Sequence, residues 1–147
     1  MQGGEVTVIA RLLRPGARLP YRATEQASGY DIYAALEGGE VTVGQHPVIV
    51  PTGIALEVPP GYDAQFRPRS GLAAKGVLAT FGTLDADYRG EIKITLYTTA
   101  PDITHTVRDG DRIAQLVINR LVVACFELAE ELSASARGTG GHGSTGR

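Results

Sequence analysis

The stretch EIKITLY (residues 91–97) alternates apolar and polar residues without interruption. Ile92, Ile94 and Leu96 therefore fall on one face of an extended chain, and the polar residues fall on the other. GIALEV (residues 53–58) repeats this pattern. Further candidate strands are EVTVIARLL (5–13), EVTV (40–43), YDAQF (62–66), VLATF (77–81), RIAQLVI (112–118) and RLVVACFEL (120–128). Glycine and proline turn signals separate them and no strand–helix alternation is visible, so an all-β sandwich, jelly roll or barrel is predicted.

The size and charge of the chain narrow its class. Its 147 residues predict one domain, and its net charge of −2 argues against a surface that binds nucleic acid. No stretch approaches the roughly 18 apolar residues of a membrane span. No secretory leader is visible at the start, so no membrane partner and a cytoplasmic location are expected. The single cysteine, Cys125, lies in an apolar run and is expected to be a buried small hydrophobe.

The last residues form a segment of different composition. Residues 133–147, SASARGTGGHGSTGR, contain no Leu, Ile, Val or Phe. We therefore expect a β domain over residues 1–132 and a flexible glycine-rich arm over 133–147. The arm is either a disordered terminus or a flap that orders over a phosphate ligand, with Arg137, Ser144 and Thr145 as donors. GTGGHG (138–143) matches G-x-G-x-x-G but lacks the strand and helix that a dinucleotide fingerprint requires.

Four internal motifs contain residues that can carry chemistry, and each has a structural alternative. In RPRSGLAAKG (67–76), Arg69 and Ser70 precede a possible helical turn, which is either an anion site or a turn capped by Ser70. In GTLDADYRGEI (82–92), Asp85 and Asp87 would share a face of an extended chain. Either Asp85 is a general base toward water, or both carboxylates are solvated turn residues.

Two further motifs lie on predicted strands. In ASGYDIYA (27–34), Asp31 is either a hydrogen-bonded structural residue or an orienter of waters around a hard cation. In GDRIAQLVI (110–118), Asp111 and Arg112 can simply pair with each other, and Gln115 can donate to a ligand. The histidines and Cys125 lack the spacing of zinc ligands.

Taken together and in this order, these four motifs and the tail RGTGGHGSTG (137–146) resemble the five motifs of the trimeric dUTP pyrophosphatase (dUTPase) family. The resemblance runs from about residue 20 to the C-terminus. It implies an antiparallel β jelly roll that assembles as a homotrimer with a flexible C-terminal tail. Three active sites would lie at subunit junctions, with motifs one, two and four from one subunit, motif three from a second and the tail from a third.

The resemblance also implies a reaction, dUTP + water → dUMP + pyrophosphate, with Mg²⁺ as cofactor. This reaction keeps uracil out of DNA and supplies dUMP for thymidylate synthesis. Asp85 matches the general base that deprotonates the water attacking the α-phosphorus. Tyr88 matches the residue that packs under the deoxyribose and excludes a ribose 2′-hydroxyl. Asp31 matches an acidic residue that holds water ligands of Mg²⁺, while the three phosphates bind the metal itself.

The remaining substrate contacts that the resemblance implies fall into three groups. Arg137, Ser144 and Thr145 match tail groups that clamp the γ-phosphate. Arg69, Ser70, Gly71 and Gln115 match phosphate-binding positions. Backbone groups from Ala79 to Thr83 would read the uracil edge. The resemblance implies substrate binding by Asp85 and Tyr88 and by a further set of residues. This set comprises Arg69, Ser70, Gly71, Ala79, Thr80, Gly82, Thr83, Lys93, Gln115, Arg137, Gly141, His142, Gly143, Ser144 and Thr145.

The sequence departs from the family pattern at two positions. His142 stands where the family usually has a phenylalanine that stacks on uracil, and this smaller ring predicts slightly weaker substrate binding. Ala79 stands where many members have a polar residue near the uracil edge, and Thr80 or backbone groups would compensate.

Two other classes of function are compatible with an all-β fold of this kind. A dCTP deaminase shares the fold family, but it needs a glutamate placed for proton transfer to the cytosine amine, whereas this chain has LDADYRG. A non-catalytic nucleotide sensor or a structural trimer has no need of Asp85 or of a phosphate clamp in the tail.

Overall fold

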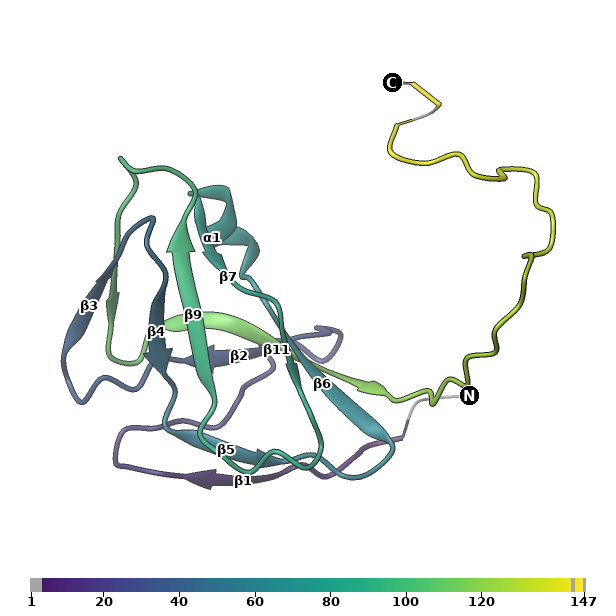
Figure 1. Ribbon diagram of the computed structural model, residues 1–147. Coiled ribbons are helices and arrows are strands. Elements are labelled where there is room, and N and C mark those ends of the chain that lie inside the picture. The colour runs from purple at the N-terminus through teal and green to yellow at the C-terminus, as the bar shows by residue number, and fades with distance from the viewer. Residues whose placement is uncertain (1–3, 144, 147) are drawn as a thin grey trace.

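The computed structural model describes residues 4–143 and 145–146. In this part of the chain, short strands dominate and one short helix interrupts them, as Figure 1 shows. The elements are β1 (Ile9–Leu12), β2 (Tyr30–Tyr33), β3 (Glu40–Val43), β4 (Val48–Pro51), β5 (Ile54–Glu57), β6 (Tyr62–Arg67), α1 (Ser70–Ala74), β7 (Val77–Ala79), β8 (Gly82–Leu84), β9 (Lys93–Thr98), β10 (His105–Arg108) and β11 (Arg112–Arg120).

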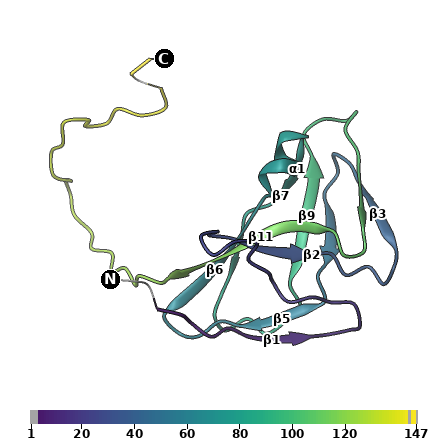
Figure 2. The same ribbon diagram turned by 180° about the vertical axis from the view of Figure 1, so that it is seen from behind.

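All strand pairs are antiparallel. The largest sheet has the order β2-β11-β6-β8, and a second has the order β4-β9-β7. β1 pairs with β5, and β10 pairs with β3. The ribbons wrap around a shared interior when they are viewed from either side (Figures 1 and 2). The fold is an antiparallel β jelly roll, which confirms the predicted fold class.

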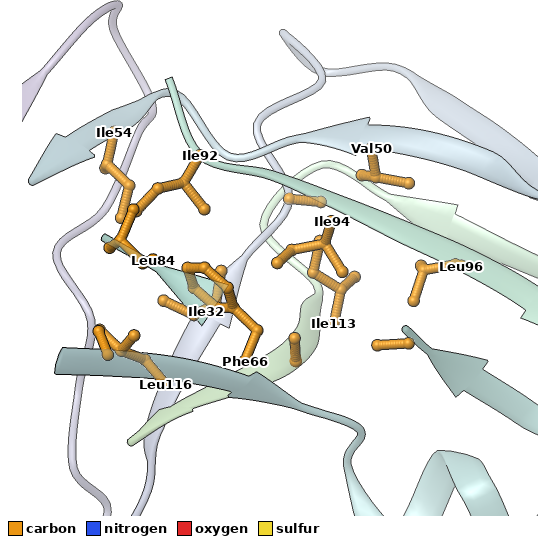
Figure 3. Close-up of a cluster of buried hydrophobic side chains, with 14 of the residues drawn as sticks. Ile32, Val50, Ile54, Phe66, Leu84, Ile92, Ile94, Leu96, Ile113 and Leu116 are labelled. Atoms are coloured by element: carbon orange, nitrogen blue, oxygen red, sulfur yellow. The ribbon is translucent and has the colours of Figure 1, made fainter. Parts of the chain in front are cut away.

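The core follows the period of two that the sequence shows. Ile92, Ile94 and Leu96 are at most 3% exposed. Ile54 on β5 is buried with them, and Figure 3 shows these side chains pointing into one cluster. Burying one large aliphatic side chain contributes about 1.5–3 kcal/mol, so alternation in several strands is enough to fix which face of each strand points inward.

The prediction for the stretch RLVVACFEL was wrong. β11 ends at Arg120, and residues 121–132 form no strand. Val122, Val123 and Phe126 are 84%, 88% and 92% exposed, and Cys125 is also exposed rather than buried. The apolar composition indicates that this stretch needs cover, but the chain's own barrel provides none. Figure 2 shows the chain leaving the barrel after β11.

Several local expectations were corrected as well. EVTVIARLL is a strand only over β1, and VLATF only over β7. α1 begins at Ser70, with Arg69 before it, and no side chain caps the helix. Ser70 is therefore the first helical residue and not the cap. No helix among the described residues has the length and apolar character to span a membrane.

Candidate functional site

A cavity of about 340 Å³ lies between β6, β8 and the start of β9. Five of the residues expected to bind substrate line it, and they come from one continuous stretch, residues 82–93. The lining comprises Phe66, Gly82, Thr83, Leu84, Asp85, Tyr88, Glu91, Ile92 and Lys93. The cavity therefore brings together two carboxylates, a phenol and an ammonium group at the edge of the core.

β8 sets the position of Asp85. Leu84 is 5% exposed and pairs with Ala64 of β6, so it anchors the end of the strand in the core. Asp85 follows it and is exposed. The Tyr88 N–H donates to the Asp85 carbonyl at 3.1 Å, so residues 85–88 form a turn, which is one of the two arrangements that the sequence left open. Asp85 lines the cavity and Asp87 does not, which separates the two carboxylates.

The Tyr88 ring folds back onto its own loop. Its hydroxyl donates to the backbone carbonyl of Glu91 at 2.9 Å. A Cβ added at Gly90 would approach the Tyr88 hydroxyl oxygen and ring carbons closely, and the nearest of these ring carbons would be 2.7 Å away. Glycine at this position therefore allows the ring to lie across the backbone. Tyr88 is 45% exposed and presents an aromatic surface to the cavity.

Glu91 is a cavity residue that the sequence analysis did not identify. Its carboxylate accepts hydrogen bonds from Arg14 Nη1 at 3.1 Å and Nη2 at 2.6 Å, and from the Gly53 N–H at 3.2 Å. The hydrogen bonds from Arg14 lower the pKa of Glu91, and the same pairing raises the pKa of Arg14. The two residues are 77 positions apart, so no local motif signals the pair.

A second group of predicted residues lies in the largest sheet. Asp31 on β2 is opposite Gln115 on β11, which is in turn opposite Arg67 on β6. Asp31 is 7% exposed. Arg69 Nε and Arg112 Nη1 each lie 3.8 Å from one of its carboxylate oxygens. The main chain approaches Gln115 closely at Gly29, where an added Cβ would be 2.7 Å from Oε1.

This second group, Asp31 with Arg69, Arg112 and Gln115, is called the arginine cluster below. Arg112 faces Asp31, so the alternative in which Asp111 pairs with Arg112 is not the arrangement found. The Asp111 carboxylate instead accepts from the Arg108 N–H at 2.8 Å. Ser70 and Gly71 begin α1 directly after Arg69. None of the residues of the arginine cluster lines the cavity in the part of the chain that the structure describes.

The hairpin expected to read uracil is only partly at the cavity. Gly82 and Thr83 line it, but Ala79 is 4% exposed and paired with Leu96, and the Thr80 N–H donates to the Thr95 carbonyl at 3.0 Å. Neither Ala79 nor Thr80 is among the described lining residues.

The tail residues stand apart from both groups. The Arg137 Nε donates to the Gly140 carbonyl, and the Gly138 N–H donates to the Ser135 hydroxyl at 3.1 Å. His142 is exposed with φ of 50°, and Gly143 and Thr145 are exposed as well. Gly141 is partly buried, and a Cβ added there would be 3.7 Å from an Arg137 nitrogen. Ser144 lies outside the described residues.

The protein groups alone offer little to a metal ion. Within residues 4–143 and 145–146, no three His, Cys, Asp or Glu side chains gather in a metal-binding group. Among the hydrogen bonds found there, none is donated to the Asp31 carboxylate, since both arginines are at 3.8 Å. Its oxygens can therefore accept from the water ligands of a Mg²⁺ ion whose direct ligands belong to another molecule.

A jelly roll with an exposed carboxylate and an aromatic ring at one cavity, and with an arginine cluster outside that cavity, defines a protein with binding groups for a polar ligand. Comparison with known proteins gives the particular family. The profile of the dUTPase family matches residues 16–146. The chain belongs to the dUTPase family.

Named relatives and solved structures agree with this assignment. The chain is 48% identical over 132 residues to the deoxyuridine 5′-triphosphate nucleotidohydrolase of Bdellovibrio bacteriovorus, covering 88% of each chain. It is 46% identical over 138 residues to the protein of the same name from Chlamydia trachomatis serovar L2, covering 91% of this chain and 94% of the relative.

Among solved structures, a mutant dUTPase of Staphylococcus bacteriophage 80alpha with dUpNHpp matches with a TM-score of 0.81 at 27% identity. That match covers 96% of this chain and 99% of the phage protein. A mutant dUTPase of phage phi11 of S. aureus, described with a structural Mg(II) ion, matches with a TM-score of 0.76 at 26% identity. It covers 88% of this chain and 100% of the phage protein.

Proposed function

We propose that this chain hydrolyses dUTP to dUMP and pyrophosphate. The observation that carries the proposal is the cavity that joins Asp85 and Tyr88 of the motif GTLDADYRGEI with Lys93, the residue that follows the motif. Membership of the dUTPase family and the names of the relatives support the same substrate. A dUTPase of the same fold with dUpNHpp supports a nucleoside triphosphate as the ligand.

In the proposed reaction, Asp85 acts as the general base. A water hydrogen-bonded to its carboxylate attacks the α-phosphorus, and its proton passes to Asp85. The new bond joins the water oxygen to that phosphorus, and the bond to the oxygen bridging the α- and β-phosphorus breaks. Pyrophosphate leaves with that electron pair. The exposure of Asp85 at the end of β8 gives water access, while buried Leu84 fixes its backbone position.

The nucleoside contacts follow from the same motif. The ring of Tyr88 packs under the deoxyribose and leaves no space for a 2′-hydroxyl. Backbone groups of the hairpin from Ala79 to Thr83 read the uracil edge. Gly82 and Thr83 are the candidates that the cavity supports directly, whereas the Thr80 N–H is already bonded to Thr95. His142 stacks on the uracil once the tail closes.

The phosphates require positive charge and donors. Arg69, Ser70, Gly71 and Gln115 contact the triphosphate, and Lys93 adds an ammonium in the cavity. Asp31 holds water ligands of Mg²⁺, consistent with a carboxylate that lacks direct donors. When bound, Mg²⁺ supplies charge neutralisation at the phosphate oxygens. Arg137, Gly141, Gly143, Ser144 and Thr145 close over the γ-phosphate as an arm of residues 133–147 on the domain 1–132.

We also propose that the active protein is a homotrimer with shared sites. The separation of the cavity from the arginine cluster supports it, because a triphosphate nucleotide must engage both chemistries at once. The apolar segment after β11 gives independent support, because its side chains are exposed and need a partner to cover them. Its exposed members, which we call the apolar arm, are Leu121, Val122, Val123, Phe126, Leu128 and Leu132. A second copy of the chain would remove this surface from water.

The direct test is pyrophosphate release from dUTP, UTP, dTTP and dCTP, with and without Mg²⁺, together with ammonia release from dCTP. We expect dUTP alone to be an efficient substrate. Asp85→Asn should lower kcat about 10²- to 10⁴-fold, the usual contribution of a general base, with dUTP binding retained. Asp87→Asn is the matched control, since it neutralises a carboxylate two residues away outside the cavity. Equal loss in both variants would contradict the role of Asp85.

A further inference from the structure

The loop that carries Tyr88 is held by a residue from a distant part of the chain. Arg14 lies after β1, outside every motif that the sequence analysis identified. Its guanidinium makes a two-pronged contact with Glu91, at 3.1 Å and 2.6 Å. The side chains of Arg14 and Glu91 are 23% and 19% exposed, so water competes less for this pair than for pairs on the open surface.

The base of this contact is itself tightly fixed. The Leu13 N–H donates to the Gly53 carbonyl at 2.7 Å, and the Gly53 N–H donates to the Glu91 carboxylate. Gly53 has φ of 69°, and a Cβ there would be 2.8 Å from that of Ala17, so only glycine fits without a shift. The Ile92 N–H donates to the Ile54 carbonyl at 2.9 Å. Arg14 therefore joins residue 91 to a rigid part of the barrel.

Glu91 in turn sets the position of the Tyr88 ring. Its backbone carbonyl accepts the Tyr88 hydroxyl at 2.9 Å, while its side chain points to Arg14. A shift of the Glu91 Cα atom would move both groups together. The ring otherwise rests on Gly90, which has no side chain to restrain it. The order of the contacts is Arg14, then Glu91, then Tyr88, and the last two line the cavity.

From this chain of contacts, we infer that Arg14 is a positioning residue that fixes the Tyr88 ring through Glu91 and so sets the discrimination between deoxyribose and ribose nucleotides. The inference rests on the proposed hydrolysis of dUTP. A small displacement of the ring is enough to matter, because steric exclusion of a single hydroxyl depends on a fraction of an ångström. Arg14 contacts neither water nor phosphate in this scheme, so its loss should affect selectivity more than the chemical step.

The experiment compares kcat/KM for dUTP and UTP in the full chain and in Arg14→Gln, Arg14→Lys and Glu91→Gln. We expect the dUTP-to-UTP ratio to fall roughly 5- to 10-fold in Arg14→Gln, about the worth of one hydrogen bond, with kcat for dUTP near that of the wild type. In Arg14→Lys the dUTP-to-UTP ratio should lie between those of Arg14→Gln and the wild type, since a lysine keeps the charge but not the fork of donors. Thermal melting establishes that each variant is folded.

Arg108→Gln is the matched control. It removes an arginine–glutamate pair of similar type, Arg108 with Glu40 at 3.6 Å, on strands that do not line the cavity. If Arg14→Gln does not fold, Glu91→Gln decides by the same ratio, because it keeps the shape of the side chain. An unchanged dUTP-to-UTP ratio in the folded variants would overturn the inference about Arg14 but not the proposed function. A wild-type chain that releases no pyrophosphate from dUTP would overturn the proposed function and this inference with it.

Discussion

Asp31 and Gln115 face each other across neighbouring strands, with Asp31 between two guanidinium groups and Gln115 next to the closely approaching main chain at Gly29. The first and fourth motifs, far apart in sequence, therefore meet in one ladder of the β2-β11-β6-β8 sheet. The Arg69 Nη1 also donates to the Arg112 carbonyl at 3.3 Å, which ties the second motif to the same place. Three motifs thus converge on one carboxylate.

Asp31→Asn should raise the Mg²⁺ concentration needed for half-maximal dUTP turnover. Groups that act on a metal through its water ligands typically change metal affinity about 10- to 100-fold, and we expect a shift in that range. The amide keeps the shape of the carboxylate but loses its charge. A Mg²⁺ titration of pyrophosphate release measures the shift, with Asp102→Asn, an exposed turn residue, as the control. An unchanged titration curve would exclude the proposed role of Asp31.

Substitutions at Ile94 should show that EIKITLY supports the core. Ile94→Ala should lower the free energy of unfolding by about 2–5 kcal/mol, whereas Ile94→Val should cost about 0.5–1.5 kcal/mol. The residue is 3% exposed and lies within the main cluster (Figure 3), so a deleted methyl group leaves a cavity. Urea unfolding followed by circular dichroism gives both values. Equal costs for the two variants would mean that the surrounding side chains collapse into the space.

The contrast between two stretches explains how far the sequence predicts the fold. EIKITLY and RLVVACFEL are both apolar enough for a strand, but only the first is buried. The first stretch has partners in its own chain, since β9 pairs with β4 and β7. The second has none in the described barrel. Hydropathy indicates that a surface needs cover but not which chain supplies it, so Cys125 and its neighbours were placed wrongly.

The candidate site was predictable wherever its parts are close in sequence. Asp85 and Tyr88 fall within one motif and Lys93 directly follows it, so a strand and a turn are enough to bring them to one cavity. Arg14 and Glu91 were missed because their contact depends on how β1 and β5 pair beside the loop, which no local pattern records. The same reason explains Arg112, whose partner Asp31 was less obvious than its neighbour Asp111.

The stability of the chain should fall on acidification, in part through Asp109. Its carboxylate accepts from the Leu36 N–H at 2.8 Å and the Gly38 N–H at 2.9 Å, and these backbone hydrogen bonds lower its pKa. Because the pKa of Asp109 is lower in the folded state, the unfolded chain binds more protons at pH values between the folded and the unfolded pKa. The contribution of Asp109 to stability is therefore complete above the unfolded pKa of about 4 and is lost as the pH falls through the folded pKa.

Asp109→Asn tests this pH dependence. The variant should be less stable than the wild type at neutral pH, and the difference should shrink as the pH falls below about 4 and through the lowered folded pKa, where the wild-type carboxylate becomes protonated. Urea midpoints measured from acid to neutral pH give the comparison. A constant difference across the whole range would mean that the loss comes from packing and not from the charge.

Removal of the tail should separate folding from activity. Among the hydrogen bonds of the described residues, those of Arg137 and Gly138 stay within the tail, so residues 136–147 contribute little to the barrel. The truncated chain should melt near the wild-type temperature but lose most dUTP hydrolysis. The truncation should lower the hydrolysis of dUTP. It should leave the affinity for dUMP unchanged, because dUMP has no γ-phosphate. Full hydrolysis by the truncated chain would refute a closing flap.

Mixing two inactive variants should restore activity if the sites are shared between subunits. The Asp85→Asn chain lacks the base but has the tail, and the chain truncated after residue 135 has the base but lacks the tail. In a mixed trimer, some sites combine an intact Asp85 with an intact tail. We expect pyrophosphate release from dUTP after the variants are unfolded and refolded together, but not after either is refolded alone.

Phe126→Ser in both chains should reduce this recovery, because Phe126 is 92% exposed in the apolar arm and would need a neighbour to cover it. Light scattering reports the oligomer size in each mixture. Mixed trimers without recovered activity would show that each site is built from a single chain.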